Sequence, residues 1–146
     1  MILYTLGFTK RTANNFFELL KEQKVELLLD IRLNNSSQLA GFTKGNDLKY
    51  FLAEICQCKY LHRVDFAPTK DILDSYKKRN MQWDEYEKQY LQLIERRGVA
   101  KNFYDKFSEY ERICILCSEP TADNCHRRLL AEIIEKTFPQ VKIKHL

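Results

Sequence analysis

Residues 115–134 read ILCSEPTADNCHRRLLAEII and contain the strand-to-helix joint on which the predicted fold depends. The uninterrupted apolar run over 112–116 is typical of a central strand that is covered on both faces. Apolar residues then recur at helical spacing over 129–138, so we expect a helix directly behind the strand. The joint between the two elements carries two thiols, a carboxylate, an imidazole and two guanidinium groups, which makes it the candidate functional site.

Two further apolar runs, at 2–6 and 25–31, are each short enough to be a buried strand. Hydrophobic residues at helical spacing over 16–20 lie between them, and Thr12 is placed to cap that helix. A strand, a helix and a second strand in this order predict a parallel pair joined by a right-handed crossover.

The remaining pattern completes an α/β domain. Residues 32–46 are rich in Asn, Ser and Gly without periodicity, and a loop of this length is often functional. The chain then predicts a helix at 47–56, a strand at 59–62, helices at 69–79 and 83–97, and a half-exposed edge strand at 141–145. We therefore expect residues 1–146 to form a single three-layer α/β domain on a mostly parallel sheet of about five strands.

The composition is that of a globular protein. Charged residues make up 30% of the chain and hydrophobic residues 45%, which excludes wholesale disorder and the fibrous classes. The net charge of +4 is modest, and the basic clusters are interleaved with acidic residues. Nucleic acid is therefore allowed as a partner but not indicated, and no oligomeric state follows from the pattern.

Cysteine usage and hydropathy predict a cytoplasmic protein. The five cysteines include no C-x-x-C pair, and the N-terminal apolar stretch is too short for a signal peptide. We therefore expect free thiols in a reducing compartment. No apolar stretch approaches the length of about 18 residues that a membrane span requires, so a membrane is not an expected partner.

Polar side chains follow three of the predicted strands. In open parallel sheets, ligands bind beyond the carboxyl ends of the strands, where loops diverge and helix N-termini point inward. We therefore expect three loops that are distant in sequence to form one site. Its candidate members are Gly7, Thr9, Asp30, Arg32, Cys117, Glu119, Cys125, His126 and Arg127.

These residue types predict nucleophilic chemistry on an anionic ligand. Cys117 or Cys125 would be the nucleophile, and His126 or Glu119 would move protons. Cys125 is expected in the first turn of the helix, with Thr121 or Asp123 as the cap. The helix dipole there would lower the pKa of its thiol. The arginines and the helix N-terminus would hold a phosphate or another anion. The expected ligand-binding residues are Gly7, Thr9, Asp30, Arg32 and Arg127.

A structural explanation is open for each of these residues. Either thiol can pack as a small hydrophobic side chain. Arg127 can pair with Asp30 or Glu119, and Arg32 can pair with Asp30, because charges near a core need partners. The aromatic stripe over 83–90 predicts core packing or a dimer face.

We expect no metal ion and no cofactor. Cys117, Cys125 and His126 supply suitable ligand atoms, but structural zinc sites usually have four ligands with paired cysteine spacing. Adjacent side chains on a helix also diverge by about 100°. Two other functions compete with an enzyme or ligand-binding domain. One is a non-catalytic module that associates with nucleic acid or protein, and the other is thiol redox chemistry between the two cysteines.

Three motifs resemble a bacterial and archaeal family called domain of unknown function 488. Its members open with a T-I-G-H-S-like turn, continue with D-V-R and end with a C-x-E and C-H-R block. The matching positions are Thr5-Leu6-Gly7-Phe8-Thr9, Asp30-Ile31-Arg32, Cys117-Ser118-Glu119 and Cys125-His126-Arg127. Phe8 stands where members commonly have His, and Asn35 where a Pro usually follows D-V-R. The resemblance spans nearly the whole chain and implies no particular activity.

The order of elements is also faintly similar to that of rhodanese-type sulfurtransferases. In those enzymes a cysteine ends a central strand, and its thiolate lies in a loop that leads into a helix N-terminus. The segments LLLDIR, ICILC and VKIKHL occur here in the matching order. The loop in this chain is longer and lacks a glycine-rich cradle, so the likeness is one of layout rather than activity.

Overall fold

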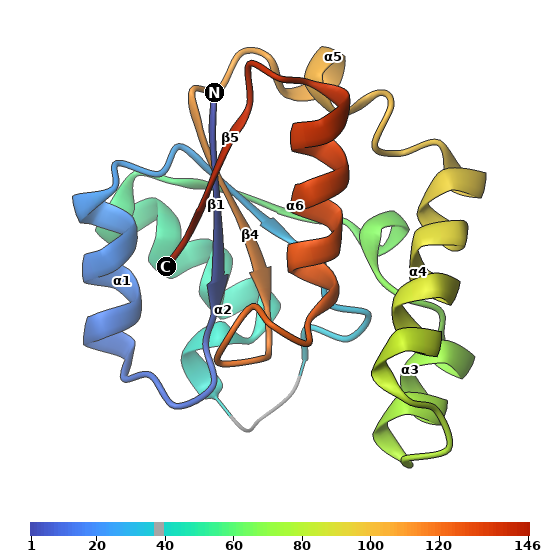
Figure 1. Ribbon diagram of the computed structural model, residues 1–146. Helices are drawn as coiled ribbons and strands as arrows, with labels where there is room; N and C mark the ends of the chain where they lie inside the picture. The colour runs from blue at the N-terminus through green and yellow to red at the C-terminus, as the bar shows by residue number, and fades with distance from the viewer. Residues whose placement is uncertain (37–39) are drawn as a thin grey trace.

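The computed structural model describes residues 1–36 and 40–146, and strand β4 (Arg112–Cys117) lies at the centre of its sheet (Figure 1). The strand order is β3-β2-β4-β1-β5, and every pairing is parallel. The other strands are β1 (Ile2–Gly7), β2 (Leu27–Asp30), β3 (Lys59–His62) and β5 (Lys142–His145). The predicted central strand and the predicted parallel α/β class are confirmed.

Helices cover both faces of the sheet, as the uninterrupted apolar strands require. Successive residues of β4 alternate between two cores: Ile113 and Ile115 join one, whereas Cys114 and Leu116 join the other. The first core packs against α4 (Trp83–Arg97), α5 (Phe103–Phe107) and α6 (His126–Thr137). The second packs against α1 (Ala13–Glu22), α2 (Gly45–Phe51) and the π-helical turn Leu52–Cys56. The three-layer prediction is therefore confirmed.

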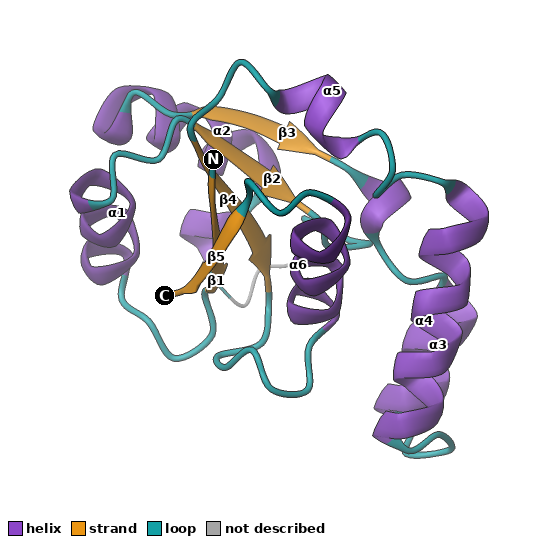
Figure 2. Ribbon diagram, turned by 45° about the horizontal axis from the view of Figure 1, so that its top comes forward, coloured by secondary structure: helices purple, strands orange, loops and turns teal. Residues whose placement is uncertain are grey.

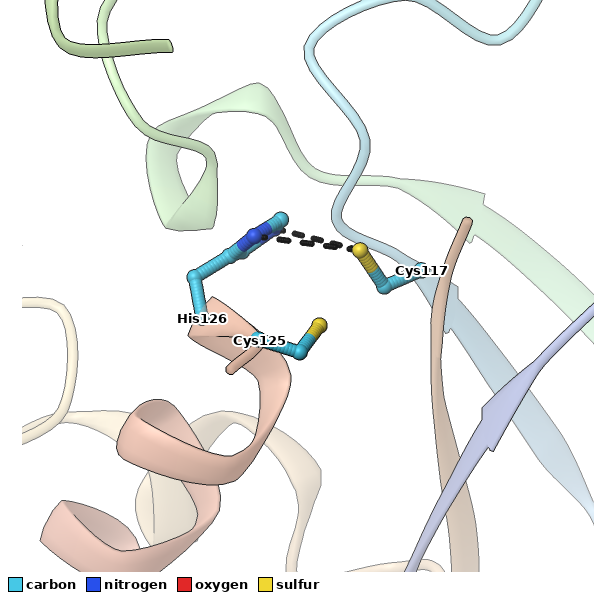
Figure 3. Close-up of side chains that lie close together, drawn as sticks. All are labelled: Cys117, Cys125 and His126. Carbon is cyan, nitrogen blue, oxygen red and sulfur yellow. Dashed lines mark hydrogen bonds between the residues drawn. The ribbon is translucent and has the colours of Figure 1, made fainter. Parts of the chain in front are cut away.

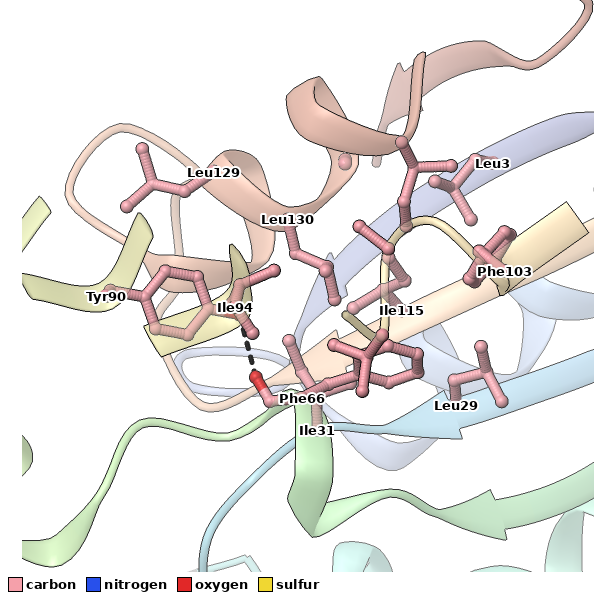
Figure 4. Close-up of a cluster of buried hydrophobic side chains, with 14 of the residues drawn as sticks. Leu3, Leu29, Ile31, Phe66, Tyr90, Ile94, Phe103, Ile115, Leu129 and Leu130 are labelled. Atoms are coloured by element: carbon pink, nitrogen blue, oxygen red, sulfur yellow. Dashed lines mark hydrogen bonds between the residues drawn. The ribbon is translucent and has the colours of Figure 1, made fainter. Parts of the chain in front are cut away.

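Helices α3 (Lys70–Lys77) and α4 form a pair outside α6 (Figure 2). Tyr90 of α4 is fully buried, and its hydroxyl donates to the Phe66 carbonyl oxygen at 2.7 Å (Figure 4). Tyr86 is also buried, whereas Trp83 is half-buried, so the aromatic stripe belongs to the core. The turn between α3 and α4 projects past the edge at which β1 and β4 end (Figure 1).

The predicted loop over 32–46 is shorter than expected. Helix α2 begins at Gly45 rather than Asp47, and a 3-10 turn occupies Gly41–Thr43. Residues 37–39 of the predicted loop lie outside the described residues. The pattern also missed α5, because five residues are too few to show helical periodicity.

The helix ends follow ordinary capping rules. Thr12 caps α1 as predicted, and its hydroxyl accepts from the Asn15 N–H at 3.1 Å. Thr69 caps α3 in the same way through the Ile72 N–H. Among the helices that the structure describes, none combines the length and apolar character needed to traverse a lipid bilayer.

Candidate functional site

The carboxyl ends of the two neighbouring strands β1 and β4 bring their loops into contact. Gly7, the last residue of β1, is in register with Cys117, the last residue of β4. The Glu119 carbonyl oxygen lies 1.6 Å from the position that a Cβ atom on Gly7 would occupy, so a glycine is required there. The Thr9 N–H donates to the Ser118 carbonyl oxygen at 3.2 Å. The loop after β4 therefore folds across the end of β1.

Cys125 lies immediately before α6 and not in its first turn, which corrects the prediction. It is itself the N-cap residue, with extended backbone (φ −140°, ψ 135°), and neither Thr121 nor Asp123 takes that position. Because the extended residue interrupts the helical spacing, its side chain stays close to that of His126. The sulfur atoms of Cys117 and Cys125 and a ring nitrogen of His126 lie within 4.8 Å of one another (Figure 3).

The contact between Cys117 and His126 is the centre of the site. The Cys117 Sγ lies 3.7 Å from Nδ1 and 3.8 Å from Nε2 of the ring. Nε2 also lies 3.2 Å from the Ile31 carbonyl oxygen, and Nδ1 lies 3.4 Å from the Tyr86 hydroxyl. The Tyr90 ring packs edge-on against the His126 ring, and the two ring centres lie 5.5 Å apart. A doubly protonated ring can therefore donate to the Ile31 carbonyl and to the Cys117 sulfur at once.

Cys117 and His126 shift each other toward an ion pair. A hydrogen bond from the Cys125 thiol makes the largest contribution to holding the pKa of Cys117 well below its usual value. Burial opposes this shift, but His126 and the backbone at Glu119 add to the lowering. Burial also lowers the pKa of His126, yet the Cys117 thiolate more than offsets it and raises that pKa overall. The site therefore favours a thiolate beside an imidazolium.

Arg127 is a buried guanidinium whose contacts are to atoms of the same site. Its Nη1 donates to the Glu119 carbonyl oxygen at 2.6 Å and to the Cys125 Sγ at 3.4 Å. None of the carboxylates among the described residues lies within salt-bridge distance of it, and its Nε has no hydrogen-bond partner. Arg127 thus pairs with neither Asp30 nor the Glu119 carboxylate, and it places a positive charge beside the thiols.

Asp30 and Arg32 form a buried ion pair, as the structural alternative predicted. Arg32 donates through Nε and Nη2 to the Asp30 carboxylate at 2.8 and 2.6 Å, and through Nη2 to the Thr43 carbonyl oxygen at 2.7 Å. The Tyr60 hydroxyl donates to the same carboxylate at 2.7 Å, and the guanidinium lies 5.1 Å from the centre of the Phe8 ring. The N–H donors of Arg32 that make its shortest hydrogen bonds are therefore all bound to partners within the protein.

A cavity of about 580 Å³ adjoins Cys117 and His126. Its walls are the carboxyl edge of the sheet, the loop after β4 and the α3–α4 pair. The predicted site residues that line it are Arg32, Cys117, Glu119, Cys125 and His126. The other four predicted residues do not line it: Gly7, Asp30 and Arg127 are buried, whereas Thr9 is exposed and its N–H donates to the loop after β4.

Residues of α3, α4 and their connecting turn form the wall that sequence reasoning missed. They include Tyr76, Lys77, Arg79, Trp83 and Tyr86. The basic cluster over 77–79 and the aromatic stripe over 83–90 were both visible signals in the sequence. Neither signal shows that the helix pair folds against the sheet edge, because that placement depends on how α4 packs against α6.

Cys117, Cys125 and His126 lie close enough together to bind a metal ion as well. Two thiolates and an imidazole are a known ligand set of catalytic zinc. The argument from diverging helical side chains is wrong here, because Cys125 is extended. Arg127, with Nη1 3.4 Å from the Cys125 Sγ, opposes a divalent cation at the same sulfur. This contact counts against a metal ion at the three side chains.

These features define a parallel α/β domain with a buried cysteine–histidine pair at the carboxyl edge of its sheet. The chain belongs to the family described as domain of unknown function DUF488, whose model matches residues 12–134. The match confirms the resemblance and includes the Asp30-Ile31-Arg32 and Cys125-His126-Arg127 motifs, whereas the turn over 5–9 precedes it. Searches of the curated proteins and of the solved structures found no match.

Proposed function

We propose that this protein is a cysteine-dependent enzyme of the reducing cytoplasm that acts on a small anionic ligand bound beside Cys117. One observation carries this proposal: the buried Cys117 Sγ lies 3.7 and 3.8 Å from the two ring nitrogens of His126. A thiolate with an adjacent imidazolium is the activated form of a cysteine nucleophile. Cys117 is therefore assigned as the nucleophile and His126 as its proton donor and acceptor.

The position of Cys117 supports this role. It is the last residue of β4, and the positive end of the α6 dipole lies next to it, because His126, the first residue of that helix, contacts its sulfur. Cys114, three residues earlier on the same strand, lies in the core, where burial raises the pKa of its thiol. Of these two cysteines only Cys117 lines the cavity. Position at the strand end thus separates a reactive thiol from an inert one.

The basic side of the cavity supports an anionic ligand. Lys77 is the last residue of α3 and Arg79 follows in the turn; both are exposed, and both line the cavity. Glu119 is the one acidic side chain among the described lining residues. Lysine and arginine attract carboxylate and phosphate groups, and field lines concentrate in a cleft lined by one sign of charge. We assign the ligand's anionic group to this side and its reactive atom to the Cys117 side.

The reaction follows from the charges at Cys117 and His126. The Cys117 thiolate donates an electron pair to an electrophilic atom of the ligand, and the bond from that atom to its leaving group breaks. The leaving group departs with the electron pair of that bond and takes a proton from the His126 imidazolium. The protein is left with a covalent bond at Cys117 and a neutral imidazole at His126.

Thiol mapping tests this proposal. Reduced protein is treated briefly with iodoacetamide at pH 7, and labelled peptides are quantified by mass spectrometry. We expect Cys117 to be labelled first, because its lowered pKa gives it a larger thiolate fraction than a thiol with an ordinary or raised pKa. Cys56 is the internal control, since burial raises its pKa to about 11. Labelling of Cys117 no faster than Cys56 would overturn the proposal.

A nucleic-acid-associating module is the competing function, and the exposed basic cluster over 77–79 is the feature that favours it. Such a module would bind nucleic acid with an affinity that falls steeply with salt and that survives Cys117→Ser. Binding of that kind, together with slow labelling of Cys117, would replace the enzyme proposal.

A further inference from the structure

Cys125 is a second buried thiol at the cavity, and the nucleophile assigned above makes no use of it. We propose that Cys125 is the resolving thiol of a two-thiol reaction, in which Cys117 attacks the sulfur–sulfur bond of a small anionic disulfide. This inference rests on the proposed function, because it requires Cys117 to be the nucleophile. It adds the substrate class and a second reacting residue.

The positions of the two sulfur atoms suit a bond between them. Both cysteines line the cavity, and their Sγ atoms belong to a group that lies within 4.8 Å (Figure 3). Cys117 ends β4 and Cys125 precedes α6, so the irregular loop over 118–124 joins them. Bond formation requires side-chain rotation and an adjustment of this loop that shorten the separation to a disulfide length of about 2 Å.

The other cysteines lie away from the cavity. Cys114 points into the core on the α1 side of the sheet, and Cys58 is buried near β3. Cys56 is half-buried, and its thiol lies 3.6 Å from the Phe17 carbonyl oxygen. Only Cys117 and Cys125 among the five share the cavity. The chain therefore offers one candidate pair and three built-in controls.

The charges around Cys125 favour its use as the second thiol. In the resting site, its hydrogen bond to Cys117, then burial and the charge of that thiolate, raise the pKa of Cys125. Arg127 opposes this shift, with Nη1 3.4 Å from the sulfur. Once Cys117 carries a bound group it has no charge, and the influence of Arg127 persists. The first step therefore makes the second thiol easier to ionise.

Bonds, protons and electrons balance over two exchanges. First, the Cys117 thiolate attacks one sulfur of the disulfide, the sulfur–sulfur bond breaks, and the departing thiolate takes the His126 proton. Neutral His126 then takes the Cys125 proton, and the Cys125 thiolate attacks the Cys117 Sγ. The second ligand thiolate leaves and is protonated by His126. The ligand disulfide is reduced to two thiols, and the two cysteines are oxidised to one disulfide.

The cavity fits this substrate class in size and charge. A volume of about 580 Å³ lies in the range of sites that hold small molecules. Lys77 and Arg79 lie on its lining and can hold carboxylate groups, while the half-buried Tyr76 and Trp83 supply apolar surface for the rest of the ligand. An anionic disulfide has a sulfur–sulfur bond that Cys117 can attack and negative charges that Lys77 and Arg79 can bind.

Glutathione disulfide, which carries several carboxylates, is the probe. Reduced full-length protein is mixed with a small excess, quenched with acid at intervals and analysed by intact mass and peptide mapping. We expect the mass to fall by two hydrogen atoms and the peptides of Cys117 and Cys125 to be linked. Cys125→Ser should instead accumulate a mixed disulfide at Cys117, with release of the second glutathione slowed at least about tenfold, because resolution then needs an external thiol.

Matched variants and a second probe sharpen the test. Cys56→Ser should behave as the wild type, whereas Cys117→Ser should form neither adduct nor linked peptide. Hydroxyethyl disulfide, which has no charge, should react about fivefold more slowly than glutathione disulfide at low salt and should lose this disadvantage at high salt. If Cys125→Ser does not give the wild-type circular dichroism spectrum, Cys125→Ala serves in its place.

The outcomes separate this inference from the proposed function. Rapid iodoacetamide labelling of Cys117, with no linkage to Cys125 under the probe, would overturn the inference and leave the nucleophile assignment intact. Slow labelling of Cys117 would overturn both. A linkage that forms equally fast between other cysteine pairs would also overturn the inference, because the reaction would then be nonspecific.

Discussion

The Glu119 carbonyl oxygen occupies the space that a side chain on Gly7 would need. A Cβ at position 7 would lie 1.6 Å from that oxygen and 2.7 Å from its carbonyl carbon. Arg127 donates to the same oxygen at 2.6 Å, so the loop is held from two sides. This contact fixes the path of the chain between Cys117 and Cys125. A glycine outside the cavity lining thus constrains where the sulfur atoms of Cys117 and Cys125 lie.

Gly7→Ala is therefore expected to lower the free energy of unfolding by about 3 kcal/mol, because the backbone of Glu119 must move. Gly41→Ala is the matched control, since a Cβ at Gly41 would meet no atom of the described residues within 4 Å. Thermal and urea unfolding measure both variants. Equal stability of the two would contradict the close approach at Gly7.

His126→Asn is expected to move the pH profile of Cys117 alkylation toward higher pH. The imidazolium stabilises the thiolate and so lowers the pKa of Cys117; without it that pKa rises. The wild-type rate should hold as the pH falls below the usual pKa of a thiol, and it should decline only as the pH drops through the lowered pKa of Cys117. In His126→Asn the rate at pH 7 should fall about tenfold or more.

The control is His145→Gln on β5, whose ring contacts the Thr5 hydroxyl at 2.7 Å, away from the cavity lining. It should leave the profile unchanged. A second readout is the pKa of His126 by NMR, which should fall when Cys117 is alkylated, because the thiolate that raises it is removed. An unchanged profile in His126→Asn would show that the contact does not activate the thiol.

Asp30→Ala is expected to destabilise the protein by about 3–5 kcal/mol, because it leaves the Arg32 guanidinium buried without its countercharge. Asp74→Ala removes an exposed carboxylate that pairs with Lys70 on the surface, and its stability should stay close to that of the wild type. Urea unfolding compares them. A small loss in Asp30→Ala would indicate that Arg32 can reach solvent through the cavity.

Removing both Lys77 and Arg79 is expected to change reagent preference at Cys117 rather than stability. Iodoacetate carries a negative charge that iodoacetamide lacks. The iodoacetate rate divided by the iodoacetamide rate at Cys117 therefore reports the charge of the cavity. The double change to alanine should lower this ratio about fivefold at low salt, and added salt should lower it in the wild type. Lys101 is an exposed residue outside the cavity lining, so Lys101→Ala should leave this rate ratio unaltered.

Purified protein is expected to contain less than one zinc ion per chain. The Arg127 guanidinium beside Cys125 disfavours a divalent cation at this end of the cavity. Elemental analysis of protein purified without chelator measures this directly. A full equivalent of zinc that disappears in Cys125→Ser and His126→Asn would mean that the thiols serve as ligands and that the nucleophile assignment is wrong.

The amino-acid sequence determined the strands, most of the helices and the edge of the sheet where chemistry would gather. The apolar run over 113–116 is short enough for a buried central strand, and helical spacing over 129–138 indicates a helix behind it. Their alternation predicts the parallel order, and that order places polar strand ends together. Local pattern was enough for these features because each depends on the burial of neighbouring residues.

Only the tertiary structure decided which partners the polar side chains at this edge of the sheet contact. Arg32 pairs with Asp30, whereas Arg127 has no carboxylate partner among the described residues and faces the thiols. Cys125 is the extended N-cap residue of α6 instead of part of its first turn, and the loop that leads to it from Cys117 packs across Gly7. The α3–α4 wall depends on packing against α6. These contacts join residues far apart in the chain and form only when the whole core is packed. A local sequence pattern therefore does not predict them.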